Sequence, residues 1–479
     1  MTALYTNRRL GRVLTAVLSL SCLFSNTLPF LNIDLQVIIL TPMRTCLLLI
    51  SLYCLAVWLI RLFRREFRSS LAGCRMRLAV LGFMGLWSLC GVLWLVFGDC
   101  IALANTEVIG IITLFLYALC FFTLTRDQSD VRFCLRLLVL CGVVLALMAD
   151  VEVVIGSFIE GSAYHYSLEE RIALEQTLFP PSTVFTNTND LSAFLLICLA
   201  VVIYRFITAK TKKEYILCSV TALILLSPTP VANSTIFFMA FGLLVVIAFL
   251  FILCCRNGTK KQRISKSVGL AAFEGLYMFP LCGAIKFLAN KLNTAYFSGK
   301  IEEFLATHQT DSSAILDQLI NKNTGAMTDT LLNQLSANQA GYGTIHIRWW
   351  LIRAGLDFSS QHLFLGCGPA GFRKLMDGNA VYAPQTRNIV DPHNFYIELL
   401  AQYGIFFFLA YLGILFSMLA VSVKRMLAEI KAGAPGKGVL VLLLLIAFSC
   451  AAIMPSGFIR FTPIWLPFFI TVSAFEIKD

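Results

Sequence analysis

The dominant feature of the sequence is a series of long apolar runs separated by short clusters of Lys and Arg. An α-helix needs about 20 apolar residues to cross the hydrocarbon core of a bilayer. Only 14% of the 479 residues are charged, against roughly 25% in a typical soluble domain. The chain is therefore predicted to be an all-α polytopic membrane protein, and a disordered chain or an ordinary soluble enzyme is excluded.

We expect about twelve membrane-spanning helices, because twelve spans would use roughly half of the chain. An uncleaved signal anchor is the preferred interpretation of the first, since no clear cleavage site follows it. The expected ranges are 11–31, 37–60, 78–98, 106–125, 133–156, 189–208, 214–228, 231–255, 268–289, 395–423, 438–455 and 458–475.

The distribution of the basic residues predicts the orientation. The net charge of +11 sits in clusters on alternate connections, such as 61–77, 205–213 and 256–266, whereas the connectors 99–105 and 228–233 carry no Lys or Arg. Cytoplasmic loops of membrane proteins are rich in these residues. We therefore expect both termini in the cytoplasm, and the charge indicates orientation in a bilayer and no nucleic-acid partner.

The predicted outer connections divide the chain into three parts. Residues 1–289 hold nine spans and an outer loop at 157–188, residues 290–394 form a large extracytoplasmic loop, and residues 395–479 hold the last three spans. Loops this long are uncommon without a function. Two stretches of the large loop, 301–320 and 325–340, have helical patterns. Of the 16 Cys only Cys367 lies in it, so neither a disulfide framework nor a metal site is expected.

The large loop contains the pattern GxGxxG at Gly366–Gly371, with Gly366 and Gly368 as its first two glycines. A dinucleotide-binding turn would need a preceding strand and a following helix. The preceding residues 349–364 have a helical pattern instead. A tight turn between two helices of the loop is the favoured interpretation.

His393 is the leading candidate for acid–base chemistry. It lies where the large loop re-enters the membrane, and the neighbouring Asp391 and Asn394 could orient it. A histidine can act as a base near neutral pH. A lone histidine is more often structural, however, and His346, two residues before Arg348, is the second candidate.

Several cations could hold a phosphate. Arg348 and Arg353 could clamp one, because the guanidinium fork matches phosphate oxygens, or they could lie on a solvated helix face. Arg44, near the outer end of the second span, is either functional or reaches the membrane interface. Arg171 is the one cation of the loop 157–188 and a further candidate.

Two polar residues lie at the start of the sixth span. Asn187 and Asn189 could contact a substrate, but capping of the following helix is the favoured interpretation.

The stretch Gly366-Cys-Gly-Pro-Ala-Gly-Phe372, followed by Asp391-Pro-His-Asn-Phe-Tyr-Ile-Glu-Leu-Leu-Ala-Gln-Tyr-Gly404, resembles the signature of the O-antigen ligase and Wzy-type polysaccharide polymerase superfamily. Members show an Arg before a loop helix, a G-x-G-x-x-x-F turn, and H-N followed by L-x-x-x-G. The corresponding positions here are Arg348, Gly366, Gly368, Phe372, His393, Asn394, Leu400 and Gly404. The segments Pro180–Thr183 and Asn233–Thr235 depart from the family pattern, because they lack the arginines of many relatives.

The resemblance implies a GT-C-type glycosyltransferase of the bacterial cytoplasmic membrane. Its donor would be an oligosaccharide on undecaprenyl diphosphate, and its acceptor a sugar on the outer face. His393 would deprotonate or position the acceptor, while Arg348 and Arg44, with Arg171, would hold the diphosphate. The configuration would be inverted with no cofactor, ATP or metal. A chain-length co-polymerase or a flippase is an expected partner.

Polymerisation of repeat units is the first functional hypothesis, and ligation of a finished chain to lipid A core or another acceptor is the second. The competing class is a transporter of lipid-linked oligosaccharides. Transporters place their polar elements near the middle of the membrane. Here the polar residues are concentrated in one predicted outer loop, which favours an enzyme.

Overall fold

The computed structural model describes residues 8–24, 33–34, 39–63, 74–98, 102–155, 181–185, 187–255, 259–307, 344–455, 457–459 and 461–476. They form helices and connections, with one antiparallel pair of two-residue strands, β1 (Ile33–Asp34) and β2 (Ile39–Leu40). The helices of the first half are α2 (Arg8–Phe24), α3 (Pro42–Phe63), α5 (Arg75–Phe97), α6 (Ala102–Leu124), α7 (Gln128–Ile155), α9 (Thr188–Thr208), α10 (Lys212–Leu226) and α11 (Thr229–Ala232). Those of the second half are α12 (Thr235–Cys254), α13 (Lys260–Leu276), α14 (Cys282–Thr307), α16 (Thr344–Gln361), α17 (Gly371–Met376), α18 (Ala383–Thr386), α19 (Phe395–Ala432), α20 (Lys437–Ala451) and α21 (Trp465–Glu476).

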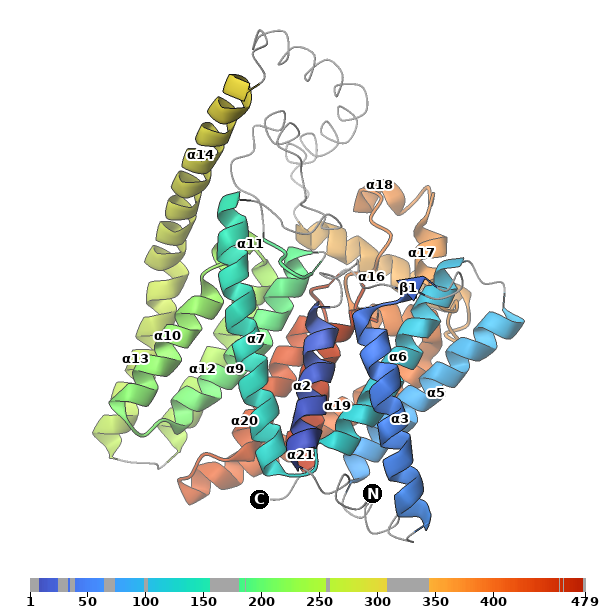
Figure 1. Ribbon diagram of the computed structural model, residues 1–479, viewed down its shortest axis with the longest axis horizontal. Helices are drawn as coiled ribbons and strands as arrows, with labels where there is room; N and C mark the ends of the chain where they lie inside the picture. Colours follow the sequence, from blue (N-terminus) through green and yellow to red (C-terminus); the bar gives the residue numbers. More distant parts are fainter. Residues whose placement is uncertain are drawn as a thin grey trace.

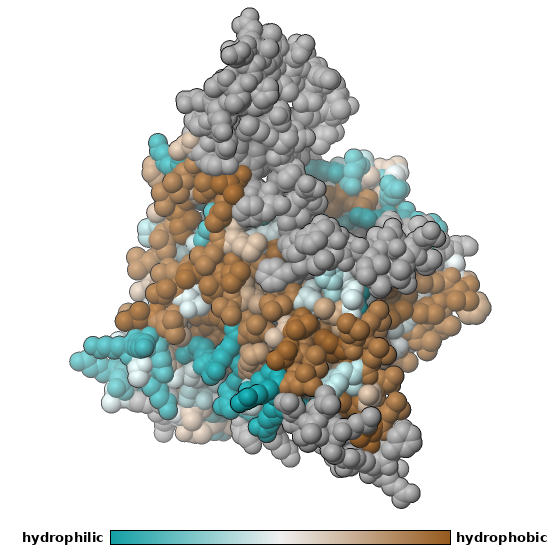
Figure 2. All heavy atoms as spheres, viewed as in Figure 1, coloured by the Kyte–Doolittle hydropathy of each residue, from teal (hydrophilic) through white to brown (hydrophobic). Residues whose placement is uncertain are grey.

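Eight helical segments of the described chain are long and apolar enough to cross a membrane: α3, α5, α6, α7, α9, α10 with α11, α12 and α19. Figure 2 shows apolar side chains over the middle of the visible face and hydrophilic ones gathered at its lower edge. The predicted all-α polytopic membrane protein is therefore confirmed. Each of the twelve expected spans coincides at least in part with a helix, but α2, the α13–α14 segment, α20 and α21 fall outside the set of eight, so the number twelve stays a prediction.

Helices α13 and α14 form one long rod at the left of Figure 1. A π-helical turn, Tyr277–Leu281, joins them and contains Pro280. Proline lacks an N–H group, and a widened turn accommodates its ring. The rod continues to Thr307, beyond the expected end of the span at 289. Apart from 301–307, which are helical, the predicted helical stretches at 301–320 and 325–340 lie outside the described residues.

Helices α9 and α20 lie at the centre of the bundle, and most of their residues are buried. At one end of α20, an aromatic cluster joins the start of α19 to the start of α21. The ring centroid of Phe395 lies 4.8 Å from that of Phe458 and 5.5 Å from that of Trp465. The cluster fixes the position at which the chain enters α19.

The connection between α20 and α21 is the main departure from a bundle of full spans. The two helices have 15 and 12 residues, about 22 and 18 Å, and are too short for a hydrocarbon core of about 30 Å. They are shorter than expected because Pro455 and Pro463 interrupt the helical backbone. Met454 and Phe458 in the connection are fully buried. Non-helical backbone is tolerated at membrane depth only where the protein surrounds it.

The glycine turn at Gly366 lies against a break in α19. At Gly404 the backbone is not helical, with φ +83°, so the preceding carbonyl groups lose their usual partners. The N–H of Cys367 donates to the carbonyl of Ala401 at 2.8 Å, and the N–H of Gly368 to that of Gln402 at 2.9 Å. A helix precedes the turn and a helix follows it. The predicted tight turn between loop helices is confirmed, and the strand that a dinucleotide-binding turn needs is missing at this place.

Both glycines are required by their surroundings. A Cβ atom on Gly366, where φ is +96°, would lie 2.4 Å from the carbonyl oxygen of Gln402. A Cβ atom on Gly404 would lie 2.6 Å from the carbonyl oxygen of Leu365. In both cases the obstacle is backbone, which cannot rotate away.

Replacing Gly404 by Ala should therefore destabilise the protein by about 2–4 kcal/mol, from the left-handed backbone and the clash together. Gly413→Ala, nine residues further along α19, is the matched control, because nothing lies within 4 Å of its Cβ position. We expect thermal unfolding in detergent to shift clearly downward for the first variant and to stay near wild type for the second. Equal unfolding temperatures of the two variants would contradict the role of the turn.

Candidate functional site

His393 lies in the turn that leads into α19. Its backbone is left-handed, with φ +48°. The next residue, Asn394, caps the helix, since its Oδ1 accepts the N–H groups of Tyr396 at 3.0 Å and Ile397 at 3.3 Å. The cap fixes the backbone beside the histidine. Asn394 therefore supports His393 through the main chain.

Arg348 of α16 joins this turn to the connection after α20. Its Nη1 donates to the carbonyl of His393 at 3.0 Å and, in a short bond, to that of Ile453, while Nη2 donates to the carbonyl of Met454 at 3.2 Å. One guanidinium thus holds three segments that are far apart in sequence. A guanidinium has five N–H donors. Within the described part of the chain, these bonds leave two of them for a ligand.

The surroundings of His393 keep its imidazole neutral. Its pKa is lowered from 6.5 to about 4, first by burial and then by the nearby charge of Arg348, against smaller opposing effects of Asp391 and the backbone of Met454. A neutral imidazole can accept a hydrogen bond or a proton from a hydroxyl group. The predicted site thus has its histidine and one of its arginines in one place.

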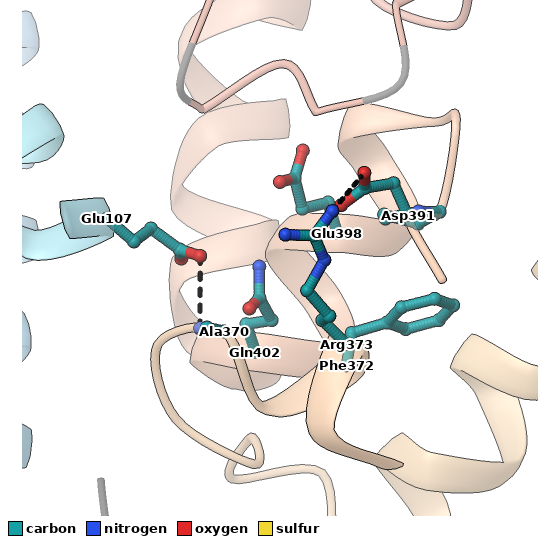
Figure 3. Close-up of a pocket in the computed structure, with 8 residues that line it drawn as sticks. Glu107, Ala370, Phe372, Arg373, Asp391, Glu398 and Gln402 are labelled. Atoms are coloured by element: carbon teal, nitrogen blue, oxygen red, sulfur yellow. Dashed lines mark hydrogen bonds and ion pairs between the residues drawn. The ribbon is translucent and has the colours of Figure 1, made fainter. Parts of the chain in front are cut away.

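A narrow pocket, drawn in Figure 3, is lined in part by Asp391 and Pro392, the two residues that precede His393. Arg373 and Asp391 point toward each other in it and form an ion pair, with 3.0 Å between Nη2 and Oδ2. Asp391 was predicted to orient His393, and its ion pair is with Arg373 of α17. The full lining is Glu107, Ala370, Phe372, Arg373, Asp391, Pro392, Glu398 and Gln402.

Two of the carboxylates in this pocket bind backbone amides. Glu107 of α6 accepts the N–H of Ala370 at 3.0 Å and the hydroxyl of Tyr403 at 2.7 Å. Glu398 of α19 accepts the N–H of Phe458 at 3.0 Å. Neither glutamate was among the residues predicted from the sequence. They lie within expected spans, and the rule that singled out Arg44, that an ionisable residue in a span is costly, applies to them equally.

The remaining predicted supports have local roles. Asn187 caps α9 by accepting the N–H of Asn189 at 2.8 Å, which confirms the capping interpretation. Gly366 and Gly368 form the turn that is bonded to α19.

The other candidate groups on α16 contact a tryptophan. The Arg353 guanidinium lies 5.1 Å from the centre of the Trp350 ring and is exposed. The indole N–H of Trp350 donates to Nε2 of His346 at 2.8 Å. His346, the second candidate, is therefore hydrogen-bonded within its own helix.

Two predicted arginines lie elsewhere. Arg44 is half-buried in the first turn of α3, which begins at the same end of the bundle as α16 in Figure 1. Arg171 lies outside the described residues. Among the residues that the structure does describe, no group of three His, Cys, Asp or Glu side chains is placed to hold a metal ion.

A bundle with eight helical segments long and apolar enough to cross a membrane, among the residues described, defines a multi-pass membrane protein. Residues 176–412, which include Arg348 and His393, match the family model described as O-antigen ligase. The chain therefore contains a domain of the O-antigen ligase family, and the resemblance seen in the sequence is confirmed. The match suggests a membrane enzyme of the O-antigen ligase or polymerase type. No curated protein matches the chain.

The low pKa of His393 predicts how stability depends on pH. As the pH falls, the unfolded chain binds a proton near pH 6.5, whereas the folded protein binds it only near pH 4. The stabilisation is therefore present above pH 6.5 and is lost between pH 6.5 and 4, by an amount on the order of 3 kcal/mol. His393→Asn should show a smaller fall in unfolding temperature over this range than wild type.

The control for this measurement is His362→Asn at the end of α16, which removes a histidine of the same loop. It should retain the wild-type pH dependence. A His393→Asn protein with the same pH dependence as wild type would show that the imidazole titrates as an exposed group.

Proposed function

We propose that the protein polymerises undecaprenyl-diphosphate-linked oligosaccharide repeat units into a surface polysaccharide. One observation carries the proposal: Arg348 and His393, the two residues that the family signature associates with this chemistry, meet at one end of an apolar bundle. A lipid-linked substrate needs this arrangement, because its carrier stays in the bilayer while its sugars reach polar groups at the membrane surface.

In the proposed reaction, a hydroxyl of the acceptor sugar attacks the anomeric carbon of the donor while the bond to the diphosphate breaks. The proton of the hydroxyl passes to the neutral imidazole of His393. A base with a pKa of about 4 is weak. It suffices when transfer is late, since the attacking oxygen becomes strongly acidic as the new bond forms. Attack opposite the leaving group would invert the anomeric centre without a metal.

The leaving diphosphate would be held by cations. Arg348 has two N–H groups beyond those that bind carbonyls, and Arg44, Arg171 and Arg353 are the further candidates from the sequence. Donors aimed at the charge that develops on a leaving group stabilise the transition state. The position of Arg348 relative to His393 is supported by the hydrogen bond between its guanidinium and the His393 carbonyl.

The proposed setting is the bacterial cytoplasmic membrane, with both termini in the cytoplasm and residues 290–394 on the outer face. The acceptor would be another lipid-linked repeat unit, and a chain-length co-polymerase or a flippase would be a partner. The second candidate is ligation of the finished chain to lipid A core or another acceptor, which the description of the matching family favours.

The lipid-linked glycans of a deletion strain distinguish these reactions. We expect single repeat units on undecaprenyl diphosphate to accumulate, as sized by mass spectrometry of extracted lipids. Long chains that stay on the lipid carrier would indicate a ligase. An unchanged profile would contradict both and point to transport.

Substitutions in the same strain test the residues. His393→Ala should abolish polymer at normal protein levels, because it removes the imidazole that accepts the proton in the proposed reaction. Arg348→Lys should lose most of the activity, since a point charge cannot bind the carbonyls and a phosphate together. Arg353→Lys is the matched control on the same helix and should lose much less. Wild-type polymer from His393→Ala would remove this residue from the mechanism.

A further inference from the structure

A second site lies toward the opposite end of the bundle from His393, in a groove between α7, α9 and α10. Its volume is about 690 Å³. Three cations, Arg136, Arg205 and Lys210, line it near the start of α7 and the end of α9. Its apolar lining is Leu135, Val139, Leu140, Val143, Val201, Val202 and Leu217.

Near the end of α10, beyond the groove, this helix lies close to α7. There, the hydroxyl of Ser227, just after α10, donates to Asp150 of α7 at 2.6 Å. Gly142 of α7 lets Leu225 approach, since a Cβ atom on this glycine would lie 3.1 Å from the leucine side chain. The apolar space lies beyond this contact, toward the basic residues.

The basic residues give the groove a net positive charge. Arg136 and Arg205 are exposed, and no described carboxylate forms a salt bridge with either. The one carboxylate among the described lining residues, Glu214, accepts the backbone N–H groups of Lys210 at 2.6 Å and Thr211 at 3.1 Å. It therefore caps α10, and three cations face an apolar channel with one carboxylate among them.

We propose that this groove binds an anionic phospholipid of the bilayer. The phosphate would be held by Arg136, Arg205 and Lys210, and an acyl chain would lie along Val139 and Val143. Basic pockets between membrane helices have this chemistry. A soluble anion would leave the apolar walls uncovered, and a lipid without net charge would leave the cations uncompensated. The proposal does not depend on the catalytic function.

A neighbouring groove provides an internal comparison. It lies on the other side of α10, against α9, α12 and α13, and none of its described lining residues is charged. Val202 and Cys218 line both grooves. Acyl chains of any lipid can cover the second groove, so selectivity for an anionic headgroup should belong to the first alone.

The test uses the full chain, delipidated in detergent and titrated with phosphatidylglycerol or with phosphatidylcholine of the same acyl chains. Native mass spectrometry gives the bound fraction. Phosphatidylglycerol should bind more tightly, and Arg136→Gln with Arg205→Gln should weaken it by roughly tenfold or more, with phosphatidylcholine unchanged. The matched control is Arg132→Gln with Lys213→Gln, which removes two charges from α7 and α10 outside the groove and should keep wild-type affinity.

A second variant leaves the charge unchanged. Val143→Trp fills the apolar part of the first groove and should abolish selective binding, whereas Ala272→Trp, in the uncharged groove, should not. The proposal is overturned if the two charge-removing pairs lose equal affinity, if phosphatidylcholine binds as tightly as phosphatidylglycerol, or if Val143→Trp binds normally. Displacement of the lipid by millimolar glycerol phosphate would identify a site for soluble anions and overturn it as well.

Discussion

The structure depends on one constraint: backbone that is not helical inside an apolar bundle must still have its polar groups bonded. Buried glutamates meet it for several connections. Their carboxylates accept backbone N–H groups from residues far away in the sequence. The pairs are Glu107 with Ala370, Glu152 with Ser182 and Thr183, and Glu398 with Phe458. Arg348 does the corresponding work for carbonyl groups after α20.

These hydrogen bonds link the stability of the fold to the geometry of the candidate site. The connection between α20 and α21 can be buried because Arg348 and Glu398 bond polar groups of its backbone. The same two residues hold the start of α19, where His393 stands. The candidate site is therefore fixed by the bonds that satisfy the fold, and a substitution at Arg348 acts on both. For this reason Arg353 on the same helix is an informative comparison.

Local patterns explain what the sequence could predict. Apolar runs indicated most spans, the Gly366 turn followed from its glycines, and the cap at Asn187 followed from its place before a span. The bonds of the site escaped prediction because they join distant segments. Glu107 and Ala370 are 263 residues apart, and Arg348 and Ile453 are 105 apart. Hydrophobic periodicity cannot predict such pairs. The shortening of the last two spans beside Pro455 and Pro463 was also missed, because the non-helical backbone between α20 and α21 is bonded by Arg348 and Glu398, which lie far from it in the sequence.

The position of Arg348 also bears on the basicity of His393. Its positive charge is one of the causes that lower the pKa of the imidazole, after burial. If the proposed donor binds through its diphosphate at Arg348, the negative charge would offset this effect and raise the pKa. The histidine would then be a better proton acceptor with donor bound than without it. With such coupling, the imidazole becomes a stronger base only when the donor is bound. Without the donor its pKa stays low, so the imidazole stays unprotonated and available to accept the proton of the acceptor sugar.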